Sequence, residues 1–191
     1  MLNIVLFGPP GSGKGTQSEK IIEKYNLIHI STGDLLREQV SAQTELGKQA
    51  KKIMDKGDLV SDNIVIGMIK IKLEEHQDCP GFIFDGFPRT VEQARELRKA
   101  LTDYDERISV MVSLEVPREE LVKRLLKRGV ETGRSDDNQE TINNRIDVYN
   151  NQTIPVTYYY DKMHKHAGID GTGTVDKIFD RIVKVIGKVK K

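Results

Sequence analysis

Residues 8–16, GPPGSGKGT, combine the residue types and the spacing that are needed to hold a chain of phosphates. They follow an apolar run, residues 2–7, and lead into a helical pattern that begins near Lys14. Glycines let successive backbone N–H groups point at an anion, the helix start adds its positive dipole end, and Lys14 adds a full charge. Strand, glycine loop and helix in this order predict a loop that binds a nucleotide triphosphate.

The loop departs from the strict pattern G-x-x-x-x-G-K-[ST] at one position. Gly8, Gly13 and Lys14 match, but Gly15 comes next and the hydroxyl follows one place later, at Thr16. In the strict pattern the residue directly after the lysine is a serine or threonine, and its hydroxyl usually holds Mg²⁺. One interpretation is a glycine-rich turn with an incidental lysine, which the strand and helix on either side argue against. We favour a variant loop in which the metal is held mainly by phosphates and water.

A second polar stretch, residues 82–90, follows another apolar strand. Asp85 ends that strand, where a carboxylate beside a phosphate loop can organise Mg²⁺ directly or through water. Asp-Gly after a strand is also an ordinary turn. Arg89 favours the phosphate site, because a guanidinium just past a strand end can bind phosphate oxygens with two parallel hydrogen bonds.

Three further stretches carry weaker signals. Residues 31–37 place Ser31 and Thr32 where either could simply cap a helix, and residues 56–60 form a turn between two helical patterns. A basic run then follows. Arg124 and Arg128 share one helix face, which is most often a solvated face. The run borders a glycine-containing segment, residues 129–137, that carries Arg134 and resembles a small movable flap, and Arg145 follows.

Composition narrows the class of protein. The chain has 191 residues, enough for one domain with a buried core, and its 30 basic and 29 acidic residues give a net charge of +1. This balance argues against nucleic-acid or membrane partners. The single cysteine, Cys79, excludes an internal disulfide and a cysteine-rich zinc site. Because the N-terminus lacks the pattern of a signal peptide and no run reaches about 20 apolar residues, we expect a cytoplasmic protein.

Short apolar runs alternate with longer amphipathic ones. This alternation predicts an α/β fold, a three-layer sandwich of the P-loop NTPase type in which a five-stranded parallel sheet is flanked by helices. His29 is expected to be packed within its strand, and the other histidines show no metal-ligand spacing. The expected strands are 3–7, 28–31, 82–85, 108–114 and 168–170. The expected helices are 14–25, 33–55 with a break near 43, 62–76, 90–101, 117–128, 138–164 and 174–187.

Taken together, these motifs resemble the adenylate kinases of the nucleoside-monophosphate kinase family. The resemblance runs from Leu2 to about Ile186, and the family's GKGT form of the loop accounts for Gly15. The motifs that carry it are GPPGSGKGTQ (8–17), STGDLLR (31–37), GDLV (57–60), FDGFPRT (84–90), Gln93, and GRSDD (133–137) with Arg145.

The resemblance implies one domain, 1–191, in three parts. The core comprises 1–30, 61–128 and 138–191, a helical insert that binds the nucleoside monophosphate comprises 31–60, and a lid of the short kind comprises 129–137. The chain has neither the length nor the thiols for the long, zinc-binding lid of other members. A monomer is expected. The 31–60 and 129–137 segments are expected to move when nucleotides bind.

The implied reaction is reversible transfer of the terminal phosphoryl group of MgATP to AMP, giving two ADP. The implied ATP-site residues are Gly11, Ser12, Gly13, Lys14, Gly15, Thr16, Arg124, Arg128 and Gly173. The implied AMP-site residues are Thr32, Arg37, Asp58, Leu59, Val60, Gly86, Phe87, Pro88, Arg89, Gln93, Arg134 and Arg145. The catalytic group comprises Lys14, Asp85, Arg89, Arg128, Arg134 and Arg145.

Phosphoryl transfer explains why cations dominate this set. The protein forms no bond to the moving group, so positive charge at fixed geometry is what the reaction needs. Mg²⁺ is expected to be held by phosphates and water, with Asp85 behind that water and no direct protein ligand.

Two other functions remain open. One is a UMP/CMP kinase on the same scaffold, against which Thr32 and Thr90 argue, because the pyrimidine-specific relatives typically carry alanine and asparagine at those positions. The other is a non-catalytic nucleotide sensor. The sequence argues against it, because none of the catalytic positions is visibly disabled. A switch-type GTPase is disfavoured by the absence of an Asn-Lys-x-Asp motif.

Overall fold

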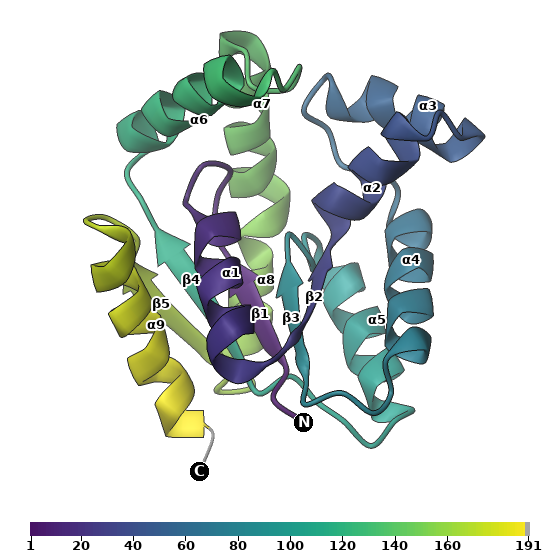
Figure 1. Ribbon diagram of the computed structural model, residues 1–191, viewed down its shortest axis with the longest axis vertical. Coiled ribbons are helices and arrows are strands. Elements are labelled where there is room, and N and C mark those ends of the chain that lie inside the picture. The colour runs from purple at the N-terminus through teal and green to yellow at the C-terminus, as the bar shows by residue number, and fades with distance from the viewer. Residues whose placement is uncertain (190–191) are drawn as a thin grey trace.

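Five parallel strands form the centre of the molecule, in the spatial order β2-β3-β1-β4-β5 (Figure 1). A computed structural model describes residues 1–189 of the chain. The predicted five-stranded parallel sheet is therefore confirmed, with strand boundaries that differ from the expected ones by at most two residues. The strands are β1 Ile4–Phe7, β2 Ile28–Ser31, β3 Phe82–Asp85, β4 Val110–Glu115 and β5 His166–Asp170.

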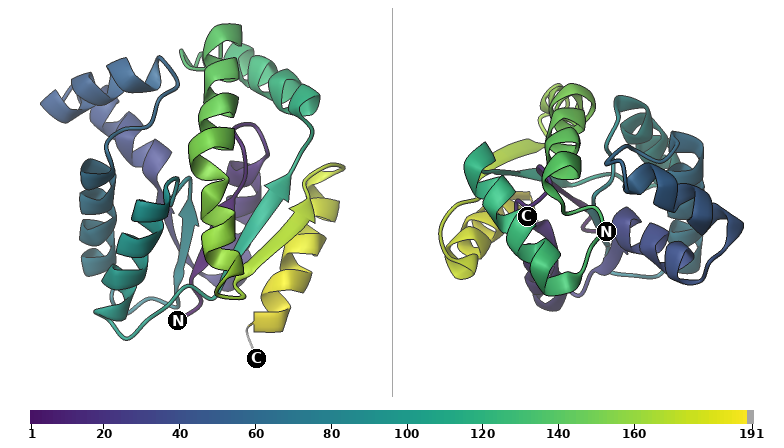
Figure 2. Two further views of the ribbon diagram at one scale, coloured as in Figure 1. Left: turned by 180° about the vertical axis from the view of Figure 1, so that it is seen from behind. Right: turned by 90° about the horizontal axis from the view of Figure 1, so that it is seen from above.

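Helices cover both faces of the sheet, which makes the three-layer sandwich that the sequence predicts (Figures 1 and 2). Because side chains alternate along a strand, β1 feeds two cores. Ile4 and Leu6 pack on one face, Val5 and Phe7 on the other, and all four are at most 3% exposed. One face is covered by α1 (Lys14–Tyr25) and α9 (Val175–Val189); the other is covered by α4 (Asp62–Glu75), α5 (Val91–Thr102) and α8 (Pro155–Asp161).

Two helical pairs rise beyond the carboxyl edge of the sheet, one on each side of the phosphate-binding loop (Figure 1). The first pair lies in the 31–60 insert, where the predicted break near 43 is confirmed. Gln43 takes a left-handed φ of 52°, and the Thr44 hydroxyl then accepts a hydrogen bond from the Gly47 N–H. The pairs are α2 (Thr32–Ser41) with α3 (Glu45–Met54), and α6 (Arg118–Thr132) with α7 (Gln139–Val148).

The predicted end of the helix at residue 128 is wrong. Helix α6 continues through Gly129 and ends where Gly133 takes a φ of 66°. This helical position is a glycine because the backbone of Asp137 crosses it closely: a Cβ at Gly129 would lie 2.8 Å from the Asp137 carbonyl oxygen. Glycine here serves packing and does not break the helix. Of the predicted flap, residues 129–132 are helical and only residues 133–137 are irregular.

The predicted single helix 138–164 is three segments. Helix α7 passes into one π-helical turn, η1 (Tyr149–Thr153), before α8 begins at Pro155. Pro155 has no N–H, so it cannot donate the next α-helical hydrogen bond. Just before it, the Ile154 N–H donates to the Tyr149 carbonyl, five residues earlier, at 2.9 Å, which is the π-helical pattern.

The expectation that His29 is packed is also wrong. Strand β2 is at the edge of the sheet, and His29 is exposed there with its Nε2 3.8 Å from Asp85 Oδ2.

Within residues 1–189, no helix has the length and apolar character that crossing a membrane requires.

Candidate active site

The loop between β1 and α1 has the backbone geometry that anion binding needs. Gly8, Gly11 and Gly13 take φ angles of 146°, 80° and 93°, in the region that glycine adopts readily. A Cβ at Gly11 would lie 2.8 Å from Leu125 Cγ and 3.0 Å from the Leu121 carbonyl oxygen. Helix α6 therefore packs directly on the loop, and this contact brings the arginines of α6 to the phosphate-binding backbone.

Lys14 opens α1 and is turned back onto the loop. Its Nζ donates to the carbonyl oxygens of Gly8 at 2.8 Å and Pro9 at 3.0 Å. Burial lowers the pKa of Lys14 to about 8; Asp85 opposes this shift, and neighbouring arginines, Arg89 foremost, add to it. A bound anion would favour the charged form of this ammonium group, because it would supply a negative partner that the surrounding guanidinium groups do not.

A cavity lies directly over the loop, and we call it the loop cavity. It collects most of the residues that the sequence assigns to ATP, together with Asp85 and Arg134. Two of the predicted residues do not line it: Ser12 is buried beneath the loop with 1% exposure, and Gly173 lies exposed in the connection after β5. The predicted residues that line the loop cavity are Gly11, Gly13, Lys14, Gly15, Thr16, Arg37, Asp85, Gly86, Arg89, Arg124, Arg128, Arg134 and Arg145.

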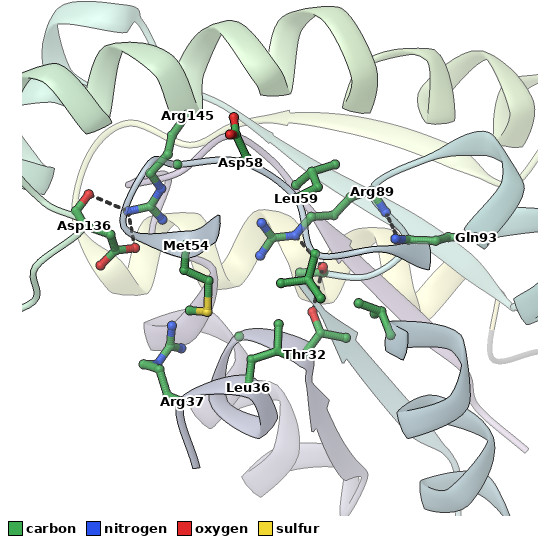
Figure 3. A pocket seen from close by; sticks show the side chains of 15 residues that line it. Thr32, Leu36, Arg37, Met54, Asp58, Leu59, Arg89, Gln93, Asp136 and Arg145 are labelled. Atoms are coloured by element: carbon green, nitrogen blue, oxygen red, sulfur yellow. Dashed lines mark hydrogen bonds and ion pairs between the residues drawn. The ribbon is translucent and has the colours of Figure 1, made fainter. Parts of the chain in front are cut away.

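A second cavity, the insert cavity, lies between the 31–60 insert and the carboxyl end of β3 (Figure 3). Leu36, Met54 and Val65, which the sequence did not single out, give it an apolar wall with Leu59 and Val60. Phe87 and Pro88 line an adjoining cavity behind it. The predicted residues that line the insert cavity are Thr32, Arg37, Asp58, Leu59, Val60, Gly86, Arg89, Gln93 and Arg145.

The two cavities meet at three arginines. Arg37, Arg89 and Arg145 line both, and Figure 3 shows their guanidinium groups converging from three different elements. Arg89 Nε donates to the Gly86 carbonyl at 2.7 Å, and burial followed by the nearby Arg145 charge lowers the pKa of Arg89 to about 10. Gly57 lets the insert approach this point closely, since a Cβ there would lie 2.8 Å from Arg145 Cγ.

Aspartates hold several of these arginines in place, and the sequence reasoning gave them no role. Asp137 is the central one, with a side chain that is 0% exposed. Its two oxygens accept from Arg128 at 2.6 and 2.8 Å, and one of them also accepts from Arg145 at 2.8 Å. Asp136 adds an ion pair with Arg145 at 2.8 Å. Asp136 and Asp137 are the last two residues of the GRSDD motif, so the motif pointed to these aspartates but did not indicate what they do.

Two more arginines have acidic partners. Arg124 pairs with Glu120 at 2.8 Å, and Arg37 pairs with Asp34. By contrast, Arg89 and Arg134 have no carboxylate partner within residues 1–189. Burial, followed by Arg37 and Arg128, lowers the pKa of Arg134. Arg89 and Arg134 are thus the guanidinium groups of the cavities that no carboxylate contacts directly within the described residues.

Asp85 faces the loop cavity, at the end of β3 beside the Lys14 side chain. The Ser18 hydroxyl lies 3.4 Å from Asp85 Oδ2. Within residues 1–189, no cluster of three or more histidine, cysteine or acidic side chains is arranged to hold a metal ion. One carboxylate with the Thr16 hydroxyl on the same cavity wall fits a cation whose remaining ligands are phosphate oxygens and water.

Fold and site together define a P-loop nucleotide-binding protein with two adjoining cavities. The family model described as "Adenylate kinase" matches residues 6–165. An adenylate kinase of Parabacteroides distasonis is 53% identical over 190 residues, covering 100% of both chains. Adenylate kinases of Phocaeicola vulgatus and Leptospira biflexa are 51% and 50% identical, covering 99% and 97% of this chain and 100% of each relative. The chain therefore belongs to the adenylate kinase family.

Neutralising Asp137 should weaken the fold. Asp137→Asn keeps the shape of the side chain but leaves two facing guanidinium groups without their shared negative charge. Since both arginines are partly exposed, we expect a loss of about 2 kcal/mol in the free energy of unfolding. For a domain of this size that loss corresponds to a melting temperature about 4–8 °C lower.

Thermal melts monitored by circular dichroism measure this loss, with Asp147→Asn as the matched control. Asp147 pairs with Arg118 at the surface, where both side chains are about half exposed. Its replacement should change the free energy of unfolding by less than about 0.5 kcal/mol. Equal melting temperatures for the two variants would contradict a stabilising role for Asp137.

Proposed function

We propose that the loop cavity binds MgATP, that the insert cavity binds AMP, and that the terminal phosphoryl group passes between them where Arg37, Arg89 and Arg145 line both. The family assignment supports reversible phosphoryl transfer from ATP to AMP, yielding two ADP, and we propose Mg²⁺ as the ion bound with ATP. The observation that carries the arrangement is the set of arginines shared by the two cavities. A phosphoryl group bound by these shared arginines would lie between the donor in the loop cavity and the acceptor in the insert cavity.

The proposed roles follow from where each side chain lies. Backbone N–H groups of residues 11–16 and the Lys14 ammonium hold the phosphates of ATP. Arg124 lies between the loop and the segment after β5, with its guanidinium 3.5 Å from the Ser12 carbonyl and 3.4 Å from that of Gly171, so it is placed to flank the donor nucleotide. The Gln17 amide donates to the Val175 carbonyl at 2.9 Å and fixes the segment that contains Gly173.

Charge balance explains the number of cations. ATP and AMP together carry about six negative charges, counting about two per terminal phosphate near neutral pH. Lys14 and six arginines oppose them: Arg37, Arg89, Arg124, Arg128, Arg134 and Arg145. Without nucleotides, Asp136, Asp137, Asp34 and Glu120 hold four of these arginines, and phosphates compete with those carboxylates. The guanidinium groups thus stay ordered in both conditions, which lowers the reorganisation needed at the reacting group.

Mg²⁺ is proposed to be held by the phosphates and by water, with Asp85 and Thr16 facing that water. When bound, the ion offsets negative charge on the phosphates. Asp85 orients the water at the end of β3, and Lys14 holds the phosphate oxygens from the other side.

Water is the competing acceptor, so the cavities must be closed during transfer. We propose that the 31–60 insert and the 129–137 lid close over the nucleotides. The Ser135 hydroxyl of the lid donates to Asp55 of the insert at 2.7 Å, so the two segments already share a polar contact. Asn144 of α7, outside the lid, also donates to the Lys56 carbonyl of the insert at 2.7 Å. We propose a monomer, as the resemblance implies, and a cytoplasmic location, with which a single cysteine is compatible.

AMP is the proposed acceptor. Gln93 and Thr32 line the insert cavity, and a side-chain amide offers a donor and an acceptor side by side, as an adenine edge requires. In initial-rate assays with MgATP, AMP should be phosphorylated faster than UMP, CMP or GMP at equal concentrations. A preference for UMP or CMP would assign the pyrimidine kinase activity instead. Binding of MgATP without any ADP formation would assign a sensor.

Removing Arg89 tests the shared position. Arg89→Ala should lower kcat by about 10³-fold, by analogy with arginine fingers in other phosphotransferases. Arg95→Ala, at a largely exposed position on α5, is the control and should leave kcat unchanged. Melting temperatures of both variants separate catalysis from folding. A kcat for Arg89→Ala within a few-fold of the unsubstituted protein would place the transferred group elsewhere.

The lowered pKa of Lys14 predicts that ATP binding takes up a proton. In the free protein Lys14 loses its charge as the pH rises through about 8, and the phosphates favour the charged form, so affinity for ATP should fall above that pH. At pH 8.5 the phosphate is already ionised, and about 0.7 proton should be taken up per ATP bound.

Calorimetric titrations in two buffers of different ionisation enthalpy measure the uptake directly. Lys14→Met should abolish it. An uptake that is unchanged in Lys14→Met would assign the proton to another group, and a zero uptake in the unsubstituted protein would contradict the lowered pKa.

A further inference from the structure

Both ends of the Gln93 amide are held by the protein. Its Oε1 accepts a hydrogen bond from the Arg89 N–H at 2.7 Å, a contact visible in Figure 3, and its Nε2 donates to Asp62 Oδ1 at 2.7 Å. Gln93 is only 2% exposed. The second oxygen of Asp62 accepts from the Thr90 hydroxyl at 2.8 Å, so the carboxylate is itself held in place.

These partners allow the amide one orientation. A backbone N–H can only donate, so it must face the amide oxygen. An ionised carboxylate can only accept, so it must face the amide nitrogen. Rotating the amide by 180° would place Nε2 against the Arg89 N–H and Oε1 against the Asp62 carboxylate, and would lose both hydrogen bonds.

The fixed orientation leaves a defined pair of groups for a ligand. One N–H of Nε2 and one lone pair of Oε1 remain, and Gln93 lines the insert cavity. Adenine offers a complementary amino donor beside a ring-nitrogen acceptor. A 6-oxopurine offers the reverse, a carbonyl acceptor beside an N–H donor, and only the rotated amide would match it.

We propose that Asp62 is a positioning residue that sets the preference for adenine over 6-oxopurines by fixing the amide of Gln93. This rests on the proposed binding of AMP in the insert cavity. Asp62 does not line that cavity; it begins α4, two residues after the 31–60 insert ends, and acts through Gln93 and the Thr90 cap of α5.

The proposal is tested by comparing AMP with inosine monophosphate, which carries an oxygen in place of the adenine amino group and adds no bulk. Asp62→Ala removes one of the two hydrogen bonds that oppose rotation of the amide and leaves only the one from the Arg89 backbone N–H. The ratio of kcat/KM for AMP to that for inosine monophosphate should fall about tenfold, the effect of one oriented hydrogen bond. The KM for MgATP should stay unchanged, because Asp62 lies outside the loop cavity.

Glu96→Gln is the matched control. Glu96 accepts from Lys70 at 3.3 Å and so also links α4 to α5; it follows Gln93 by three residues on α5, but its carboxylate bonds Lys70 and not the Gln93 amide. This variant should keep the same AMP-to-inosine-monophosphate ratio as the unsubstituted protein. A merely structural role for Asp62 would lower the rates with both acceptors together and leave the ratio intact, which would overturn the proposal.

A measurement on the unsubstituted protein covers the case in which Asp62→Ala does not fold. The side-chain amide of Gln93 should show an NMR order parameter near that of rigid backbone, about 0.85, before any nucleotide is added. A value below about 0.6 would mean that the amide rotates freely, and the proposal would be wrong. If the unsubstituted protein does not phosphorylate AMP at all, the proposed function itself fails, which is a separate result.

Discussion

The structure depends on one constraint: a lysine and six arginines must line one partly buried cavity before any phosphate arrives. Bringing like charges together in a low-dielectric site is costly unless negative partners are present. Asp137 offsets part of this repulsion, since its buried carboxylate binds both Arg128 and Arg145. Burial, with the neighbouring positive charges, lowers the pKa values of Lys14, Arg89, Arg134 and Arg145.

The fold solves the problem of bringing these charges to one place. Parallel strands end at a common edge, so β1 and β3 deliver the glycine loop and the Asp85–Arg89 turn side by side. Helices α6 and α7 supply their arginines from the other side, because Leu121 and Leu125 of α6 pack with Ile142 and Ile146 of α7 into a separate apolar cluster. The contact of Leu125 with Gly11 then fixes that cluster against the loop.

The sequence predicted the sheet, the loop and most cavity-lining residues, because these depend on local patterns: apolar runs, glycine spacing and basic side chains. It misjudged features that depend on packing. Gly129 reads as a helix breaker, and only the approach of Asp137 reveals its role. The roles of Asp62 and Asp137 could not be predicted, because a surface aspartate looks the same in sequence as one whose carboxylate is held by an amide and a hydroxyl, or by two arginines. The exposure of His29 follows from the edge position of β2, which the order of strands along the chain does not reveal.

The most direct test is a crystal structure with a bisubstrate analogue, two adenosines joined by a chain of phosphates, compared with ligand-free crystals. The account predicts that the analogue occupies both cavities, with its phosphates bound by Lys14, Arg89 and Arg145, and that Arg128 and Arg145 turn from Asp137 toward phosphate oxygens. An analogue that leaves the insert cavity empty, or arginines that keep all their carboxylate partners and do not contact phosphate, would contradict it.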